Sequence, residues 1–173
     1  MSTLILGIDP GPTNQGFVLY DRDKRGIRRS GNVSVDYMLN TIRTLKYHFC
    51  KRHQVFLAIE QVQNYGMVVG ADVFITVRNS GRFQEAWLPD TDRVEFLSYP
   101  KVKGLMGLNS RAKESGVRAW MRDRLGEFHD VAPTGLKGLK KKPGPLYGIK
   151  DHAWSALAVA IAFDILYLKT NYH

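Results

Sequence analysis

The alternation of apolar and polar positions divides the chain into short strands and amphipathic helices. Leu4 to Ile8 and Phe17 to Tyr20 are apolar runs of strand length, and the segment between them holds two Pro and two Gly. This pattern predicts a tight β-hairpin. Val55 to Ile59 is a further buried strand, and a helix-like segment precedes it. We therefore expect this strand to join the hairpin in parallel through a right-handed crossover.

The other segments complete an α/β pattern. We expect a mixed five-stranded sheet, with an antiparallel three-stranded meander plus parallel strands, flanked by helices. In the helix after Val55 to Ile59, the candidate packing residues are Val73, Phe74, Val77, Phe83 and Trp87. The further strands are expected at 27–33 and 93–97, and the helices at 35–50, 69–87, 110–125 (with Ser110 as N-cap) and 150–169. Loops are expected at 99–110 and, mobile and rich in Lys, Gly and Pro, at 135–148.

Length and cysteine usage limit the class of protein. The 173 residues fit one domain, 1–173, large enough to bury a sizeable core. Cys50 is the only cysteine, which argues against a disulfide framework or a thiolate zinc site and suits a reducing compartment. The longest apolar run is interrupted by Asp164 and falls short of a membrane span. We expect a soluble protein of the cytoplasm, or of the host cytoplasm if its origin is viral.

The charge of the chain favours a polyanionic partner. Lys and Arg number 25 against 16 Asp and Glu, which gives a net charge of +9. Residues 22–52 and 101–142 each carry an excess of +7, and the rest of the chain is net negative. Solvated surface charge is the ordinary explanation of any one lysine cluster. Two basic segments around a more acidic centre are also the arrangement expected of a nucleic-acid-binding surface with a metal site.

Acidic residues stand at the ends of two predicted strands. Asp9 ends the first strand and Glu60 ends the strand at 55–59, where the carboxyl ends of parallel strands place a site in open α/β sheets. A buried carboxylate is costly without a cationic partner, and a divalent metal is one such partner. The alternative is that Asp9 only caps a polar turn. Asp151 and His152 open the last helix with Ser155 on the same side, although Asp151 alone is also explained as a helix cap.

Five segments together resemble the RuvC family of Holliday junction resolvases. They are LILGIDPGPTNQGF, LAIEQV, VRNSGRFQEAW, KVKGLMGLNSRAK and DHAWSALAVA, in the order and at the spacing of that family. The resemblance covers essentially the whole chain. It implies an RNase H-like fold and a homodimer that cuts four-way DNA junctions. It also implies Mg²⁺, or Mn²⁺ as a substitute, held by acidic residues at three places, with two ions per site.

The resemblance assigns Asp9 and Glu60 to the first two acidic places, but the third place departs from the family pattern. In the family, an Asp or His is followed three residues later by an Asp. Here these positions are His152 and Ser155, so the last carboxylate is missing. Three alternatives are open. Asp151 supplies the third metal ligand, or His152 binds the metal or acts as base. Otherwise Ser155 marks an inactive protein. We favour an active enzyme with Asp151 as ligand and His152 assisting.

The resemblance also implies how DNA and a second subunit bind. The product is a nick with a 5′ phosphate, and a homodimer forms on the helix at 69–87, where Gly81 leaves room for close approach. Two other classes remain. One is an actin-like ATPase or sugar kinase, which needs a second similar domain, and the other is a catalytically weak or inactive branched-DNA-binding protein. The phosphate contacts are expected from Lys101, Lys103, Lys113, Arg118, Lys137, Lys140, Lys141 and Lys142.

Overall fold

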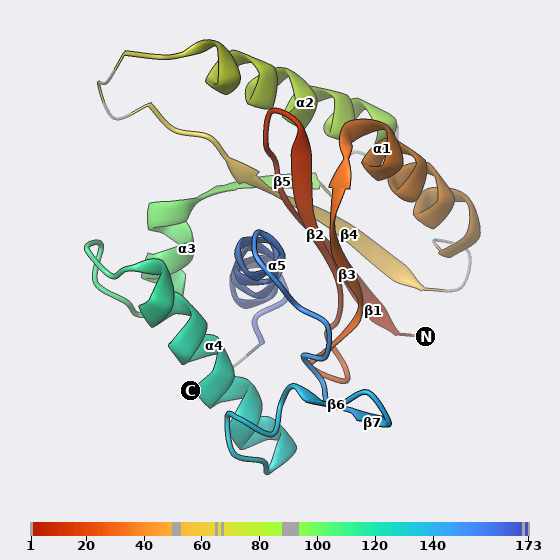
Figure 1. Ribbon diagram of the computed structural model, residues 1–173, viewed down its shortest axis with the longest axis vertical. Helices are drawn as coiled ribbons and strands as arrows, with labels where there is room; N and C mark the ends of the chain where they lie inside the picture. Colours follow the sequence, from red (N-terminus) through yellow and green to blue (C-terminus); the bar gives the residue numbers. More distant parts are fainter. Residues whose placement is uncertain are drawn as a thin grey trace.

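The computed structural model has a five-stranded mixed sheet at its centre (Figure 1). The structure describes residues 2–49, 53–64, 66, 68–87, 94–170 and 172. The strands are β1 (Thr3–Asp9), β2 (Asn14–Asp21), β3 (Gly26–Ser34), β4 (Gln54–Gln61) and β5 (Val94–Ser98). Their order is β3-β2-β1-β4-β5, with antiparallel pairing from β1 to β3 and parallel pairing of β1 with β4 and of β4 with β5. The predicted fold class is confirmed.

Helices cover both faces of the sheet. On one face lie α1 (Val35–Thr44), which continues as the π-helical turn η1 (Leu45–Phe49), and α2 (Ala71–Trp87). On the other face α5 (Ala153–Tyr167) packs directly on the strands, and α3 (Tyr99–Leu105) and α4 (Glu114–His129) pack on α5 (Figure 1). The prediction that the first helix reaches Cys50 extends beyond the described residues, because position 50 is not among them.

The buried helix α5 lies unusually close to β1 and β2. It is apolar on all sides, and its residues from Ala153 to Asp164 are buried except for Ser155. Gly7 on β1 faces the carbonyl of Ala156, and a Cβ at Gly7 would collide with that oxygen. A Cβ at Gly16 on β2 would likewise collide with the backbone of His152. These two glycines therefore set the depth at which the start of α5 sits on the sheet. No helix of the described residues is both long and apolar enough to cross a membrane.

The segment at 99–114 differs from the prediction. The expected loop forms α3, with Pro100 in its first turn, where a missing N–H costs no hydrogen bond. Lys103 is buried, and its ammonium donates to the carbonyl oxygens of Ser110 and Ala112. This contact holds the chain at 110–112 in a turn, so Ser110 is not an N-cap. The helix α4 begins at Glu114 instead, with Lys113 as its N-cap.

The Lys, Gly and Pro segment is a hairpin and not the mobile loop that its composition predicts. Short strands β6 (Gly138–Leu139) and β7 (Lys142–Pro143) pair in an antiparallel manner. Leu136 and Leu146, on either side of the hairpin, are buried, and the amide of Leu146 donates to the carbonyl of Leu136 at 2.9 Å. Two buried leucines anchor the stem, so the lysines at the tip extend from a fixed base.

The first half of α2 is more exposed than predicted. Phe74 and Val77 are 66% and 53% exposed, whereas Phe83 and Trp87 are buried. The buried stripe of the helix runs instead through small and polar residues to Phe83, so its periodicity is hidden from a purely hydrophobic pattern. A Cβ at Gly81 would meet no atom of the described chain within 4 Å.

Candidate active site at the carboxyl ends of β1 and β4

The pairing of β1 with β4 brings Asp9 and Glu60 together. The two strands run in parallel, and their last registered pair is Ile8 with Ile59, immediately before the two acids. Side chains alternate between faces with a period of two. Gly7 on β1 and Ala58 on β4 lie on the α5 face, so Asp9 and Glu60 lie on that face as well. The strand register thus places two carboxylates side by side beneath the start of α5.

Neither carboxylate has a permanent cationic partner. Asp9 is 16% exposed, and its Oδ2 lies 3.1 Å from Nδ1 of His152. Among the described residues, neither Asp9 nor Glu60 forms an ion pair with a Lys or an Arg. Burial and the absence of such a pair leave the negative charge of this site uncompensated.

Both acids hold protons more tightly than usual. Burial, together with the negative charges of Asp9 and Glu114, raises the pKa of Glu60 to about 8. Burial also raises the pKa of Asp9, whereas the neighbouring His152 and a hydrogen bond from Ser155 partly oppose that rise. A bound cation would remove the cause of both shifts, because it stabilises the charged form of each carboxyl group.

The start of α5 supplies His152 and Ser155 to the site, but it does not supply Asp151. His152 and Ser155 both contact Asp9. Asp151 lies in the turn before the helix, with a left-handed φ of 44°, and it is exposed. Within the described part of the chain, no three His, Cys, Asp or Glu side chains gather closely enough to hold a metal ion. Asp151 is therefore not gathered with Asp9 and Glu60 in this structure, and its role as the third ligand stays a prediction.

Two residues near the site were missed by the sequence analysis. Glu114, the first residue of α4, is close enough to raise the pKa of both Asp9 and Glu60. Tyr99, at the start of α3, has a buried hydroxyl without a hydrogen-bond partner among the described residues, and burial raises its pKa to about 12. Glu114 adjoins a lysine already predicted to bind DNA, but an acid at a helix start has an ordinary explanation in the helix dipole.

The loop between β1 and β2 is held by side chains that the sequence analysis did not single out. Gln15 is fully buried, and its amide bonds both the N–H and the carbonyl of Gly11. The amide nitrogen of Asn79 on α2 donates to the carbonyls of Gly11 and Pro12, at 3.1 and 3.2 Å. Thr13 and Asn14, in the same loop, are exposed. The loop is thus tied to α2, and this fixes the backbone next to Asp9.

Solved structures of the same architecture identify the fold. The Thermus thermophilus RuvC structure aligns with a TM-score of 0.61 over 92% of both chains, at 19% identity. The chain has the RuvC fold. T. thermophilus RuvC in complex with its Holliday junction substrate aligns with a TM-score of 0.63, over 92% of this chain and 91% of that one, at 18% identity. No protein family and no curated protein matches the sequence.

Within this RuvC fold, the candidate phosphate-binding residues fall into three groups. Lys101 on α3 and Lys113 before α4 are exposed. Lys103 is buried and Arg118 pairs with Glu114, so neither is a free surface cation, contrary to the prediction for Lys103. The third group, on and beside the hairpin, is exposed and consists of Lys137, Lys140, Lys141 and Lys142.

The residues at the site fit a hard divalent cation. Asp9 and Glu60 offer carboxylate oxygens, the donors that Mg²⁺ and Mn²⁺ prefer. The buried hydroxyl of Tyr99 without a protein partner indicates a polar environment that the chain alone does not satisfy. With two adjacent acids instead of three, the set is smaller than the one that the resemblance implies, and His152 is the remaining potential ligand.

Proposed function

We propose that the chain is a structure-selective endonuclease that cuts four-way DNA junctions by metal-dependent phosphodiester hydrolysis and leaves nicks with a 5′ phosphate. The observation that carries the proposal is the pair Asp9 and Glu60, partly buried side by side without a Lys or Arg partner among the described residues. The similarity to T. thermophilus RuvC with its Holliday junction substrate supports the choice of DNA substrate. Such a substrate implies the cytoplasm, or the host cytoplasm for a viral protein.

Asp9 and Glu60 are the residues that would hold Mg²⁺ or Mn²⁺ in this proposal, with room for two ions as the resemblance implies. A bound divalent ion lowers the pKa of water and stabilises the charge that develops on the phosphate. The protein contributes the fixed strand ends that orient the two carboxylates. Their raised pKa values mean that metal must displace a proton from Glu60 at neutral pH.

His152 is suited to move a proton in this reaction. Its Nδ1 faces Oδ2 of Asp9, so the neutral ring donates through Nδ1 and leaves Nε2 free to accept a proton. The side chain is 68% exposed, so it can reach an incoming phosphodiester. Asp9 would hold the ring in that tautomer while also serving as ligand. Ser155 adds a hydrogen bond to Asp9 and carries no charge.

The exposed lysines would hold the DNA backbone, whose affinity then falls steeply with salt. Lys101 and Lys113 are exposed on α3 and just before α4, and the hairpin at 138–143 projects from the body of the protein (Figure 1). Contacts of this kind position the strand and read little sequence. They fit a nuclease that selects its substrate by shape.

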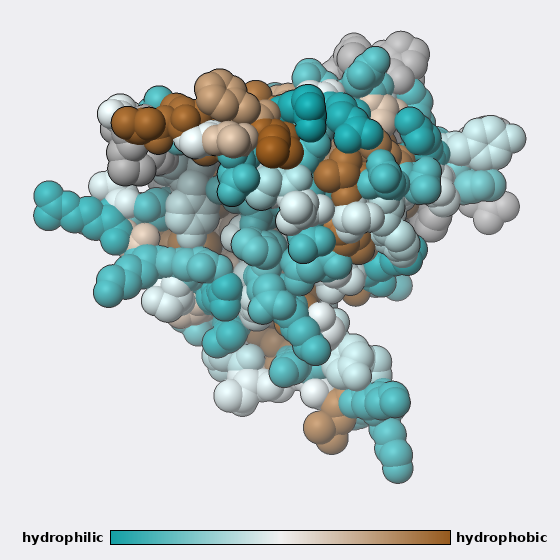
Figure 2. All heavy atoms as spheres, turned by 45° about the horizontal axis from the view of Figure 1, so that its top comes forward, coloured by the Kyte–Doolittle hydropathy of each residue, from teal (hydrophilic) through white to brown (hydrophobic). Residues whose placement is uncertain are grey.

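A homodimer is the assembly that we propose for this function. Apolar side chains gather over the first turns of α2, at the upper left of Figure 2, and the exposed ones include Val68, Phe74 and Val77. Gly81 on the same helix leaves its backbone open to another chain. Exposed apolar patches of this kind mark interfaces. Sedimentation equilibrium should give twice the monomer mass at micromolar concentration, and Phe74→Glu should give the monomer mass.

The function is tested by incubating the protein with a labelled synthetic four-way junction, with and without Mg²⁺. The expected result is paired nicks near the crossover that require the metal, and a linear duplex of the same sequence should stay intact. A second candidate is a branched-DNA-binding protein without catalysis, which the neutral Ser155 and the exposed Asp151 favour. Tight junction binding with no cleavage in either Mg²⁺ or Mn²⁺ would establish that candidate.

A further inference from the structure

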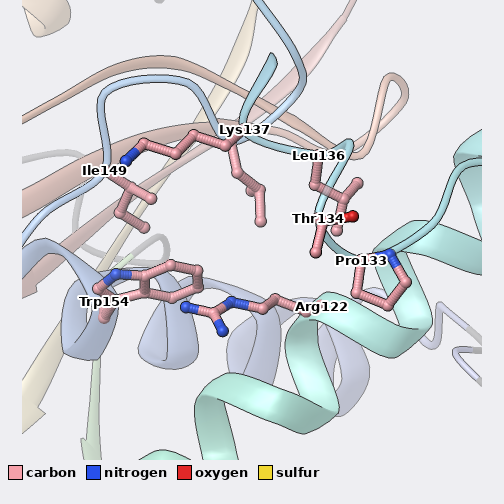
Figure 3. A pocket seen from close by; sticks show the side chains of 8 residues that line it. Arg122, Pro133, Thr134, Leu136, Lys137, Ile149 and Trp154 are labelled. Carbon is pink, nitrogen blue, oxygen red and sulfur yellow. The ribbon is translucent and has the colours of Figure 1, made fainter. Parts of the chain in front are cut away.

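A cavity of about 310 Å³ lies between α4, the segment that follows it and the first turn of α5 (Figure 3). Its volume is at the low end of the range for ligand sites, roughly 300–1,000 Å³. It has room for one small planar group and not for several. Figure 3 shows Trp154 and Arg122 along one side, with Lys137 and the aliphatic Leu136 and Ile149 on the others.

The walls combine a flat aromatic surface with positive charge. Trp154 is 8% exposed, and the guanidinium of Arg122 lies 4.9 Å from the centre of its ring. The ammonium of Lys137 adds a second cation, and none of the described residues that line the cavity is acidic. Leu136, Leu146 and Ile149 supply apolar contacts opposite the ring. A planar, apolar ring that carries a negative group is the ligand that matches these walls, and a nucleotide has both parts.

The cavity is connected to the carboxylate site through α5 and α4. Trp154 directly precedes Ser155, which hydrogen-bonds Asp9. The guanidinium of Arg118 also lies over the Trp154 ring, 5.7 Å from its centre. Arg118 pairs with Glu114, and the negative charge of Glu114 raises the pKa of Asp9 and Glu60. The cavity and the carboxylates are thus joined by adjacent residues at the start of α5 and by the Arg118–Glu114 pair on α4.

We propose that this cavity holds one unstacked nucleotide of the bound DNA strand. The base lies against Trp154 and Arg122, and its phosphate is held by Lys137. The inference rests on the proposed function only in that DNA supplies the nucleotide. Bases at a branch point are the ones most easily unstacked, because they lack a continuous helix on one side. The cavity would thus recognise the branch itself, whereas the surface lysines recognise any phosphate backbone.

The test uses the indole N–H signals of the full-length protein in ¹H–¹⁵N NMR spectra. The chain has three Trp residues, and loss of one signal in Trp154→Phe assigns the signal of Trp154. Trp87 is buried elsewhere and serves as an internal control. The probes are 2′-deoxyadenosine 5′-monophosphate, deoxyadenosine, inorganic phosphate, a short single-stranded oligonucleotide and a fully paired duplex.

We expect the mononucleotide to shift the Trp154 signal in a saturable manner, and deoxyadenosine or phosphate alone to bind at least fivefold more weakly. The oligonucleotide should act at lower concentration than the mononucleotide, and the duplex should leave the Trp154 signal in place. Arg122→Gln should weaken mononucleotide binding at least fivefold. The matched control is Arg124→Gln, which removes the same charge from the same helix, where Arg124 pairs with Glu127 at 3.0 Å, and should change nothing.

Four outcomes would overturn the inference. They are a Trp154 signal that does not move, an equal response to inorganic phosphate, equal weakening by Arg122→Gln and Arg124→Gln, and a mononucleotide that binds more tightly than the oligonucleotide. The last would assign the cavity to free nucleotides. Junction cleavage by a protein with an unresponsive Trp154 signal overturns the cavity proposal alone. A responsive signal in a protein that cuts no junction overturns the nuclease proposal alone.

Discussion

Acids removed from solvent lie at both ends of α5. Among the described residues, the acid at the C-terminal end is paired with an Arg, and the acids at the N-terminal end have no Lys or Arg partner. Asp164, near the last turn, has no exposed surface and receives hydrogen bonds from Arg22 at 3.0 Å and from the hydroxyls of Thr170 and Tyr172, both at 2.6 Å. Asp9 and Glu60, beside the first turn, have no Lys or Arg partner among the described residues, and their neighbours include His152, Ser155 and Glu114. Burial of an acid is common to both ends, so the missing cation is what distinguishes a candidate site from a structural anchor.

The Asp164 end is a closed network that fixes the C-terminal segment. The hydroxyl of Tyr172 donates to Asp164 and also lies 2.8 Å from that of Tyr20 on β2. Burial raises the pKa of both tyrosines, so they remain neutral donors and acceptors at physiological pH. Every partner of Asp164 comes from this protein, and the network needs no ligand. The negative charges of Asp9 and Glu60 are balanced in this way only when a cation binds.

The largest effect is expected from removing one charge at the uncompensated end. Asp9→Asn and Glu60→Gln should each lower junction cleavage on the order of 10³-fold or more, because each removes a metal ligand while keeping the side-chain shape. Junction affinity, measured in Ca²⁺ or without metal, should stay within about twofold, since lysines carry the binding. Normal turnover by either variant would show that the chemistry lies elsewhere.

Much of the uncompensated end could be predicted from the sequence. The apolar runs before Asp9 and Glu60 fix their place at strand ends, and parallel pairing with a period of two then fixes their shared face. The residues around them could not be placed in the same way. Glu114 reaches the site only because Lys103 folds the chain at 110–112 and delays the start of α4. A buried lysine that donates to backbone carbonyls leaves no periodic signal.

Local backbone geometry explains the other errors. Asp151 reads as a helix-opening residue, but its positive φ places it in a turn. The exposure of Phe74 depends on which stripe of α2 meets α1, and that stripe contains Asn79 and Ser80, which an apolar pattern does not count. In the same way, the Asp164 network depends on Tyr172 and Arg22, which are far apart in sequence. In the sequence, Asp164 is visible only as an interruption of an apolar run.

Substitution of Asp164 should change the stability of the protein and not its rate of cleavage. Asp164→Asn should lower the free energy of unfolding by about 3 kcal/mol, because Arg22 and two hydroxyls lose a buried anionic acceptor. Urea denaturation measures this change. Asp23→Asn is the matched control, since Asp23 meets the same Arg22 at 3.8 Å on the surface, and it should cost less than about 0.5 kcal/mol. Folded Asp164→Asn protein should still cut junctions, and a specific loss of cleavage would mean that the two ends are not separate.

The next effect separates His152 from Asp151 at the start of α5. His152→Ala should lower cleavage about 10²-fold, because the ring is the group in contact with Asp9, whereas Asp151→Asn should stay within about twofold. Single-turnover cleavage rates of the two variants and of the native protein are the measurement. Equal loss in both variants would restore Asp151 as a ligand.

Ser155→Asp should increase metal affinity, since it places a third carboxylate beside Asp9.

The last prediction concerns the pH dependence of stability, which should differ between the metal-free and the metal-bound protein. Glu60 has an ordinary pKa of 4.5 and a raised value of about 8 in the folded protein. Between these values the folded state holds a proton that the unfolded state has released, so the metal-free protein should lose stability as pH rises through this window. The stability is fully present below pH 4.5 and its loss is complete above pH 8. Glu60→Gln should flatten the curve of stability against pH, whereas Glu85→Gln, on the exposed surface of α2, should leave it unchanged.

Adding Mg²⁺ to the native protein should raise stability most at the alkaline end, where Glu60 is charged. A pH dependence that is the same in Glu60→Gln and unaffected by Mg²⁺ would mean that this carboxylate is neutralised within the protein, as Asp164 is.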